Sequence, residues 1–233
     1  YLDLHNITYT GSGSKSSKIA MDKNISKLIA QSVKIPTPNW ILIKRDQHTG
    51  LKLQNHETLK FTYPYVVKPS NEGSTYGLSI VHNENELSEA IGIAAEYCNE
   101  IIIEEYIPGR ELTVGILGNK SLPIVEIIPS NDLYDYECKY TEGMSEYIVP
   151  AELSDSLVRK LSEDALKIYN TIDCRHYARV DFRLNEKDEH YFLEINTLPG
   201  LTSTSLLPKA AKAAGLKFPN LIDSIIKIAT LEK

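Results

Sequence analysis

Four polar side chains fall on two neighbouring stretches that are predicted to be strands, HYARVDFRL and HYFLEIN. Side chains alternate between the faces of a strand, so Arg179 and Asp181 share a polar face in the first stretch. By the same alternation, Glu194 and Asn196 share a face in the second. If the two faces align, two carboxylates and an amide oxygen converge as ligands for Mg²⁺, with Arg179 placed to stabilise a developing anion. A solvated polar face with surface salt bridges fits the same spacing.

A loop of small residues follows the predicted strand that ends near Lys68. In the run VVKPSNEGSTYG, glycines flank Ser74 and Thr75, and backbone N–H groups of such a loop can approach an anion closely. Lys68 could reach the same phosphate as a point charge. The run therefore suggests a phosphate site, although a plain hairpin turn also accounts for it.

The run IIIEEYIPGRE carries acidic side chains in and after an otherwise apolar strand. Burying an unpaired carboxylate is costly, so we expect Glu104 or Glu105 to meet a ligand or a partner. The N–H groups of adenine and the hydroxyls of ribose would suit Glu104 and Glu111. An edge strand with an exposed charge is the alternative interpretation.

A run of Ser and Thr precedes an apolar helical pattern in TLPGLTSTSLLPKAA. A hydroxyl there can cap the helix that begins near Ser205, and a helix N-terminus attracts carboxylates. Capping requires no substrate, so this run alone does not predict a binding site.

The elements that must position these residues follow from hydrophobic periodicity and turn residues. Helices are predicted at 18–35, 85–98, 152–172, 205–215 and 218–230, strands at 40–43, 65–70, 78–81, 101–107, 111–117, 121–128, 176–184 and 190–196, and loops at 48–60, 71–77 and 130–147. Two hairpins and the lack of strict strand–helix alternation favour an α+β fold with antiparallel sheets. We predict two lobes, residues 1–105 and 106–233, that enclose a ligand cleft.

The composition is that of an ordinary globular protein, and it disfavours some classes of partner. A formal net charge of −6 over 233 residues disfavours nucleic acid. No apolar run approaches the roughly 18 residues of a membrane span. Three scattered cysteines without CxxC spacing fit a reducing compartment better than a disulfide framework or a zinc site. We therefore expect a cytoplasmic protein that acts on small molecules.

Taken together and in this order, the motifs resemble the D-alanine–D-alanine ligases of the ATP-grasp superfamily. The matching runs are YTGSG, AMDK, VVKPSNEGSTYG, IIIEEYIPGREL, DYECKY, ARVDFRL and LEINTLPGLTSTSL. The resemblance implies an ATP-grasp fold and a reaction in which ATP phosphorylates the carboxylate of one D-alanine. The amine of a second D-alanine then attacks the acyl phosphate, and the product is D-alanyl-D-alanine, a precursor of peptidoglycan.

The resemblance also implies a set of residues for ATP. Phosphates are expected at Lys23 and Lys68, with Ser74 and Thr75 on the loop above them. The adenine amine is expected at Glu104, the adenine edge along the backbone from Glu105 to Ile107, and the ribose at Glu111.

A second implied set serves the metal and the amino acids. Asp181, Glu194 and Asn196 are expected to bind Mg²⁺, or Mn²⁺ in its place. Arg179 is expected to stabilise the tetrahedral intermediate, and Gly200, Ser205 and Leu206 are expected to receive the carboxylate of the second substrate. Ser74 is expected in the hydrogen-bond network of the active site. Lys139 and Tyr140 are expected on a mobile loop that closes the site.

Some features depart from the family or leave alternatives open. The family begins with a further domain that contacts the first D-alanine, and we expect that domain to be missing here, so this chain could bind ATP and still fail to ligate. Thr75 stands where Ser is usual, and Tyr140 favours an amine over D-lactate as the nucleophile. A ligase for other amino acids and a nucleotide-binding module without ligase activity remain alternatives. The resemblance to this family also suggests that the protein forms a homodimer.

Overall fold

The computed structural model describes residues 1–46, 50–53, 61–130, 144–202 and 204–231. The helices are η1 (Asp3–His5), α1 (Ser14–Met21), α2 (Lys23–Ser32), α3 (Glu84–Ala95), α5 (Asp155–Thr171), α6 (Leu206–Ala213) and α7 (Phe218–Leu231). The strands are β1 (Trp40–Asp46), β2 (Gly50–Leu53), β3 (Tyr65–Pro69), β4 (Ser79–Val81), β5 (Glu100–Glu105), β6 (Arg110–Leu117), β7 (Lys120–Ser121), β8 (Val125–Pro129), β9 (Ser145–Ile148), β10 (Tyr177–Leu184) and β11 (His190–Asn196).

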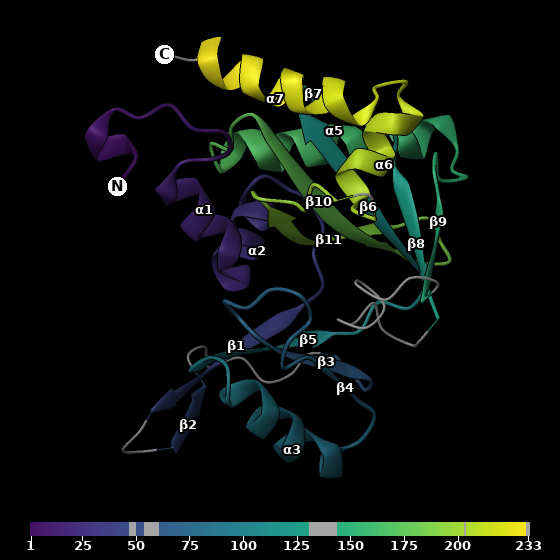
Figure 1. The fold of residues 1–233 in the computed structure, drawn as a ribbon. Helices are drawn as coiled ribbons and strands as arrows, with labels where there is room; N and C mark the ends of the chain where they lie inside the picture. The colour runs from purple at the N-terminus through teal and green to yellow at the C-terminus, as the bar shows by residue number, and fades with distance from the viewer. Residues whose placement is uncertain (47–49, 54–60, 131–143, 203, 232–233) are drawn as a thin grey trace.

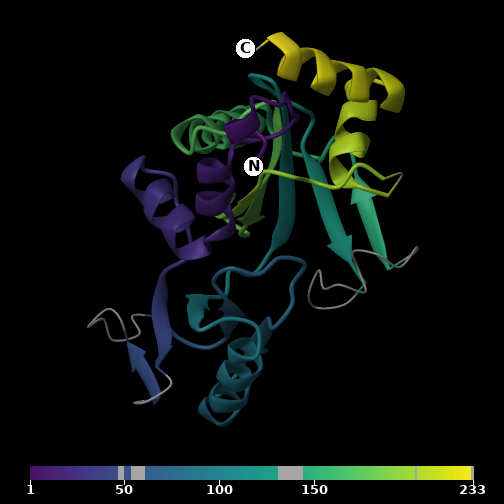
Figure 2. The same ribbon diagram turned by 60° about the vertical axis from the view of Figure 1, so that its left-hand side comes forward.

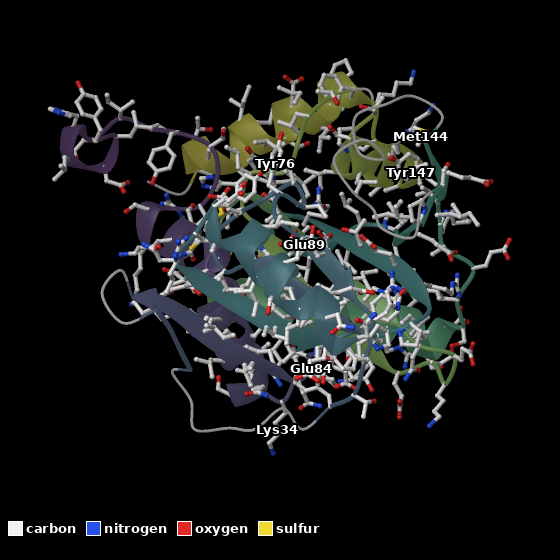
Figure 3. The ribbon with its side chains drawn as sticks, turned by 90° about the horizontal axis from the view of Figure 1, so that it is seen from below. Lys34, Tyr76, Glu84, Glu89, Met144 and Tyr147 are labelled. Carbon is white, nitrogen blue, oxygen red and sulfur yellow. The ribbon has the colours of Figure 1, made fainter. Side chains whose placement is uncertain are left out.

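The first sheet has the strand order β2-β1-β5-β3-β4, and all its pairings are antiparallel. Its central strand β5 contains three fully or nearly fully buried isoleucines, Ile101, Ile102 and Ile103. The helix α3 covers the outer face of this sheet (Figure 3), and it buries Ala90, Ile91 and Ala94. This lobe presents the ends of β3 and β5 to the rest of the molecule.

The second sheet has the order β11-β10-β6-β8-β9, with the short β7 paired to β6, and it is also antiparallel. On one face of β10, Ala178, Val180, Phe182 and Leu184 are almost completely buried, as the alternation predicted, and they pack in a core with α5. On the opposite face, α6 packs against Gly115 of β6. Figures 1 and 2 show α7 beyond α6, at the end of the molecule away from the first sheet.

The α+β class with antiparallel sheets is confirmed, but the single helix predicted at 18–35 is wrong. The chain breaks at Asp22, whose backbone is extended (φ −82°, ψ 102°) between α1 and α2. The Asp22 carboxylate accepts a hydrogen bond from the Ile25 N–H at 3.0 Å and so caps α2. The apolar periodicity continues through the break, and for that reason the pattern did not reveal it.

Two predicted loops contain strands. Within 48–60, β2 pairs with β1, and within 130–147, β9 pairs with β8. Both segments are rich in polar residues, and antiparallel pairing with a neighbouring strand satisfies their backbone groups regardless of composition. The remainder of the 130–147 prediction, at 131–143, lies outside the described residues.

The two sheets lie in separate lobes that the segment 106–109 connects. The helices α1 and α2 precede the first sheet in sequence, yet Ala20 and Ala30 belong to the core of the second lobe. The chain therefore begins in the second lobe, forms the first lobe next, and then completes the second lobe. The division of the chain into domains at 105 and 106 stays a prediction. Among the helices in the described ranges, none has both the length and the apolar character to cross a membrane.

Candidate active site

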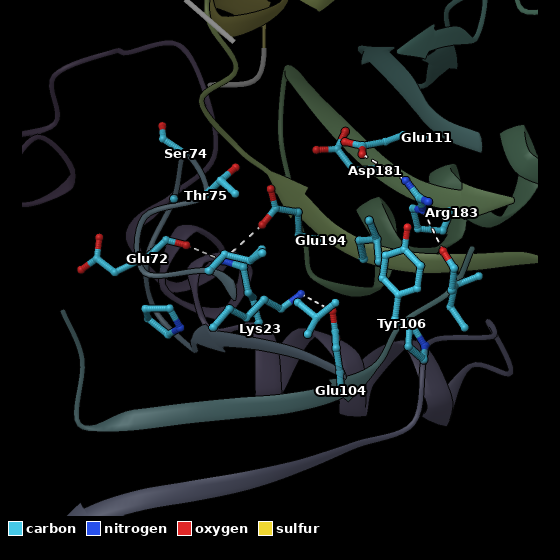
Figure 4. Close-up of a pocket in the computed structure, with 18 of the residues that line it drawn as sticks. Lys23, Glu72, Ser74, Thr75, Glu104, Tyr106, Glu111, Asp181, Arg183 and Glu194 are labelled. Carbon is cyan, nitrogen blue, oxygen red and sulfur yellow. Dashed lines mark hydrogen bonds and ion pairs between the residues drawn. The ribbon is translucent and has the colours of Figure 1, made fainter. Parts of the chain in front are cut away.

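A pocket lies between the two lobes, and residues from both sheets line it (Figure 4). It brings together eleven of the residues that the sequence singled out, namely Lys23, Lys68, Ser74, Thr75, Glu104, Glu105, Ile107, Glu111, Arg179, Asp181 and Glu194. These residues come from α2, β3, the loop after β3, β5, the connector, β6, β10 and β11. The pocket therefore exists only when the two sheets face each other.

Asp181 is held tightly on the second sheet. Its carboxylate accepts a hydrogen bond from the Thr113 hydroxyl of β6 at 2.6 Å. The Arg179 guanidinium, two residues earlier on the same face of β10, donates to both carboxylate oxygens at 2.9 Å. The arginine thus lies beside the acidic group, as the alternation predicted, and the charged pair faces the pocket.

Glu194 lies directly opposite Asp181, because β10 and β11 pair in that register. A bulge leaves Leu193 without an opposite residue, so Leu193 and Glu194 both line the pocket while Phe192 stays in the core. The Lys23 ammonium lies 3.2 Å from the Glu194 carboxylate. Two carboxylates on adjacent strands suit a Mg²⁺ that takes its other ligands from phosphate oxygens and water.

Asn196 is opposite Arg179 in the register and so shares the face of Asp181 and Glu194. Its side-chain oxygen accepts a hydrogen bond from the Leu198 N–H at 2.9 Å, and the residue is not among those that line the pocket. In the part of the chain that the structure describes, no three His, Cys, Asp or Glu side chains cluster closely enough to hold a metal. The three-ligand set therefore stays a prediction, with Asp181 and Glu194 as the members that face the pocket.

One of Glu104 and Glu105 was predicted to meet a ligand or a partner, and Glu104 has two partners. Only 2% exposed, it forms ion pairs with Lys68 and with Lys27, the latter at 2.8 Å. Burial alone would raise the pKa of Glu104, but the two ammonium groups outweigh it and lower the pKa to about 2. The carboxylate is therefore ionised at neutral pH. Lys27 was not singled out from the sequence, since its partner lies 77 residues away.

The loop after β3 turns sharply through two residues with left-handed backbones, Ser74 (φ 52°) and Thr75 (φ 65°). Such conformations are uncommon outside glycine and are typical of functional loops. The Lys23 ammonium donates to the Glu72 carbonyl, and the Lys23 N–H donates to the Ser70 carbonyl at 2.9 Å. These bonds join the start of α2 to the loop, and Figure 4 shows both beside the pocket.

Arg183 was not among the predicted site residues, and the structure gives it several partners. Its guanidinium donates to the Ile107 and Gly109 carbonyls at 3.0 and 2.9 Å and pairs with Glu111 at 3.5 Å. It also lies 5.7 Å from the ring centre of Tyr106. Arg183 therefore fixes the connector and its pocket-facing backbone. Its position on the face of Arg179 and Asp181 was the signal available in the sequence.

The residues predicted for the second carboxylate lie elsewhere. Ser205 precedes α6 as predicted, but its hydroxyl makes no cap to the helix and instead accepts from the Thr202 N–H at 3.0 Å. Gly200 lies against that hydroxyl, and Leu206 is buried at the start of α6. None of the three lines the described pocket. Lys139 and Tyr140 lie outside the described residues.

Comparison with known proteins agrees with this architecture. The family model described as D-ala D-ala ligase C-terminus matches residues 29–227. The chain is 41% identical over 232 residues to the D-alanine--D-alanine ligase of Carboxydothermus hydrogenoformans, covering 97% of this chain and 74% of the relative. It is 43% identical over 225 residues to that of Aquifex aeolicus, covering 97% of this chain and 75% of the relative.

Solved structures lead to the same family. Two crystal structures of D-alanine--D-alanine ligase from Bacillus anthracis match 99% of this chain. The one complexed with ATP has a TM-score of 0.81 at 36% identity, and the other has 0.84 at 37% identity. This chain covers 72% and 74% of them, respectively. The chain therefore has the ATP-grasp fold and belongs to the D-alanine–D-alanine ligase family.

Proposed function

We propose that this protein joins two D-alanine molecules with ATP and forms the dipeptide used for peptidoglycan. The observation that carries this proposal is the pocket between the sheets, where Lys23 and Lys68 line the same space as the carboxylates of Asp181 and Glu194. Cations that bind phosphate beside acidic metal ligands are what phosphoryl transfer to a carboxylate requires.

ATP would lie along the length of this pocket. Its phosphates would meet Lys23, Lys68 and the backbone of the loop at Ser74 and Thr75. Its adenine would lie against the connector, with Glu104 toward the amine and the backbone of Glu105 to Ile107 along the edge. Its ribose would meet Glu111. The fixed connector, which Arg183 holds, would keep this end of the site preorganised.

The reacting end would lie on the second sheet. Asp181 and Glu194, together with Asn196 as predicted, would hold Mg²⁺ or Mn²⁺. When bound, such an ion would supply positive charge that offsets the charge of the phosphates during transfer. Arg179, oriented by its ion pair with Asp181, would stabilise the anionic tetrahedral intermediate.

The acceptor site would lie at the start of α6. Gly200, Ser205 and Leu206 would receive the carboxylate of the second D-alanine, and a helix N-terminus favours an anion there. The loop with Lys139 and Tyr140 would close over the intermediate and exclude water. A cytoplasmic homodimer is the form we propose, and sedimentation of the purified protein tests the dimer.

Phosphate release tests this function. We would follow release from ATP and Mg²⁺ by the purified protein, with and without D-alanine. Release that depends on D-alanine supports the proposal. Equal release with and without D-alanine contradicts it and favours a nucleotide-binding module, and activation by another amino acid favours a ligase of different specificity. Lys68→Ala should abolish release, whereas Lys44→Ala, at an exposed position on β1 of the same lobe, should not.

A further inference from the structure

A fully buried lysine lies behind the wall of the nucleotide pocket. Lys27 of α2 is 0% exposed, and it is not among the residues that line the pocket. Its ammonium donates to one Glu104 carboxylate oxygen at 2.8 Å, while Lys68 pairs with the other oxygen of the same carboxylate. Two cations thus share one anion, and only one of them, Lys68, reaches the pocket.

The same ammonium connects the two lobes. It donates to the Thr37 hydroxyl at 2.8 Å, and that hydroxyl donates to the Phe192 carbonyl of β11 at 2.8 Å. The Lys27 ammonium also lies 4.9 Å from the ring centre of Trp40 on β1. The buried network therefore joins α2, the first sheet and the second sheet directly beneath the pocket.

The charges in this network do not cancel. A lone Lys68–Glu104 pair would be neutral, and a phosphate would have to compete with Glu104 for Lys68. With Lys27 as a third member, two ammonium groups and one carboxylate leave one net positive charge. A buried charge with a low-dielectric environment acts strongly on a neighbouring anion.

We propose that Lys27 is a positioning residue for nucleotide binding, because it takes one oxygen of Glu104 and so keeps the Lys68 ammonium effective toward a phosphate. Lys27 itself touches no ligand and acts through Glu104 and Lys68. The hydrogen bond from Lys27 also fixes the orientation of the Glu104 carboxylate toward the expected adenine. This inference rests on the proposed nucleotide site and adds a residue to it.

A pH dependence accompanies this role. Burial lowers the pKa of Lys27 to about 8, although the charge of Glu104 opposes the shift. The charged groups that act on Lys27 are Glu104, Lys68 and Glu105, and Thr37 supplies its neutral acceptor. When Lys27 loses its proton, the network loses its net charge, and ATP binding should weaken.

The experiment measures ATP affinity by calorimetry on the wild-type chain and on Lys27→Met, which keeps the side-chain length. The dissociation constant of the variant should be roughly tenfold higher or more near neutral pH, the size expected for one lost charge-assisted hydrogen bond. In the wild type, affinity should fall as the pH rises through about 8. In Lys27→Met, that fall should be absent.

Lys44→Met is the matched control, since Lys44 pairs with Glu100 at 2.9 Å on the same sheet but is exposed. Its affinity should equal that of the wild type at every pH. A Lys27→Met protein with wild-type affinity would overturn the proposal, even if it melts earlier, because a purely structural lysine predicts that result. D-alanine-dependent phosphate release by the wild type separately tests the proposed function.

Discussion

Four acidic side chains of the pocket wall are each held by a cation. Asp181 pairs with Arg179, Glu194 with Lys23, Glu104 with Lys68 and Lys27, and Glu111 with Arg183. These pairs orient the carboxylates. They also couple the ligands, since a phosphate drawn to Lys23 competes with Glu194, and a metal at Glu194 would relieve that competition. Metal and nucleotide should therefore strengthen each other's binding.

Removing the charge of Glu194 tests this coupling. Glu194→Gln should raise the Mg²⁺ concentration that gives half-maximal activity by more than about tenfold, the lower range for altered partners of a bound metal. Titration of activity with Mg²⁺ measures the change. Glu189→Gln, on the exposed turn of the same hairpin, should leave the curve unchanged. Identical curves for Glu194→Gln and the wild type would remove Glu194 from the metal site.

Asp164 provides a prediction about pH and stability. Burial would raise the pKa of this carboxyl, but hydrogen bonds from His190 at 2.7 Å and Lys160 outweigh it and lower the pKa. Because the pKa of this carboxyl is lower in the folded state, its ionisation stabilises the fold at pH values above its unfolded pKa, which is near 4. That stabilisation is lost as the pH falls through the lowered pKa of the folded state.

Asp164→Asn should therefore lower the free energy of unfolding by about 1–3 kcal/mol near neutral pH. This decrease in unfolding free energy should be smaller near pH 3, where Asp164 of the wild type is also losing its charge. Denaturant unfolding at several pH values measures it, with the exposed neighbour Glu163→Gln as control. A loss of equal size at all pH values would show that the pair does not act through its charge.

At the scale of elements, the loop after β3 depends on close packing as well as on its left-handed residues. Gly77 has φ +70°, and a Cβ there would lie 2.8 Å from the Tyr97 ring and 2.9 Å from Pro69. Tyr97 follows α3 and Pro69 ends β3, so both flanking elements confine the return of the loop. Glycine meets the conformational and the spatial requirement together.

Gly77→Ala should displace this loop and weaken ATP binding, because the strain of about 1–3 kcal/mol is relieved by moving the backbone near Ser74 and Thr75. Calorimetry with ATP measures the affinity, and thermal unfolding measures the stability. Gly92→Ala is the control, since a Cβ at that position in α3 meets nothing within 4 Å. That variant should bind ATP normally and be slightly more stable. An unchanged affinity in Gly77→Ala would mean that the loop does not contact the phosphates.

At the scale of the whole molecule, the pocket joins two sheets that have separate cores. The connector 106–109 and the network of Lys27, Thr37 and Phe192 hold the lobes together, and a bound nucleotide would add contacts to both. Ligands that bind only the folded arrangement stabilise it in proportion to the logarithm of their concentration over the dissociation constant.

ADP with Mg²⁺ at about a hundred times its dissociation constant should therefore raise the unfolding temperature by about 5–10 °C for a chain of this size. Differential scanning calorimetry measures the shift. A chelator added with the same ADP should reduce it, since Asp181 and Glu194 then lack the ion that offsets the phosphates. A shift that is insensitive to the chelator would contradict metal-assisted binding at these residues.

The sequence by itself determined the antiparallel hairpin of β10 and β11, the polar face shared by Arg179 and Asp181, and the sharp loop after Lys68. These features are local, because strand alternation and turn conformation depend on residues close together in the chain. Only the tertiary structure decided the bulge at Leu193, the buried partnership of Lys27 with Glu104, and the return of α1 and α2 to the second lobe. Each of these depends on how the two sheets dock. Contacts between residues far apart in the chain produce no local hydrophobic periodicity from which they could be predicted.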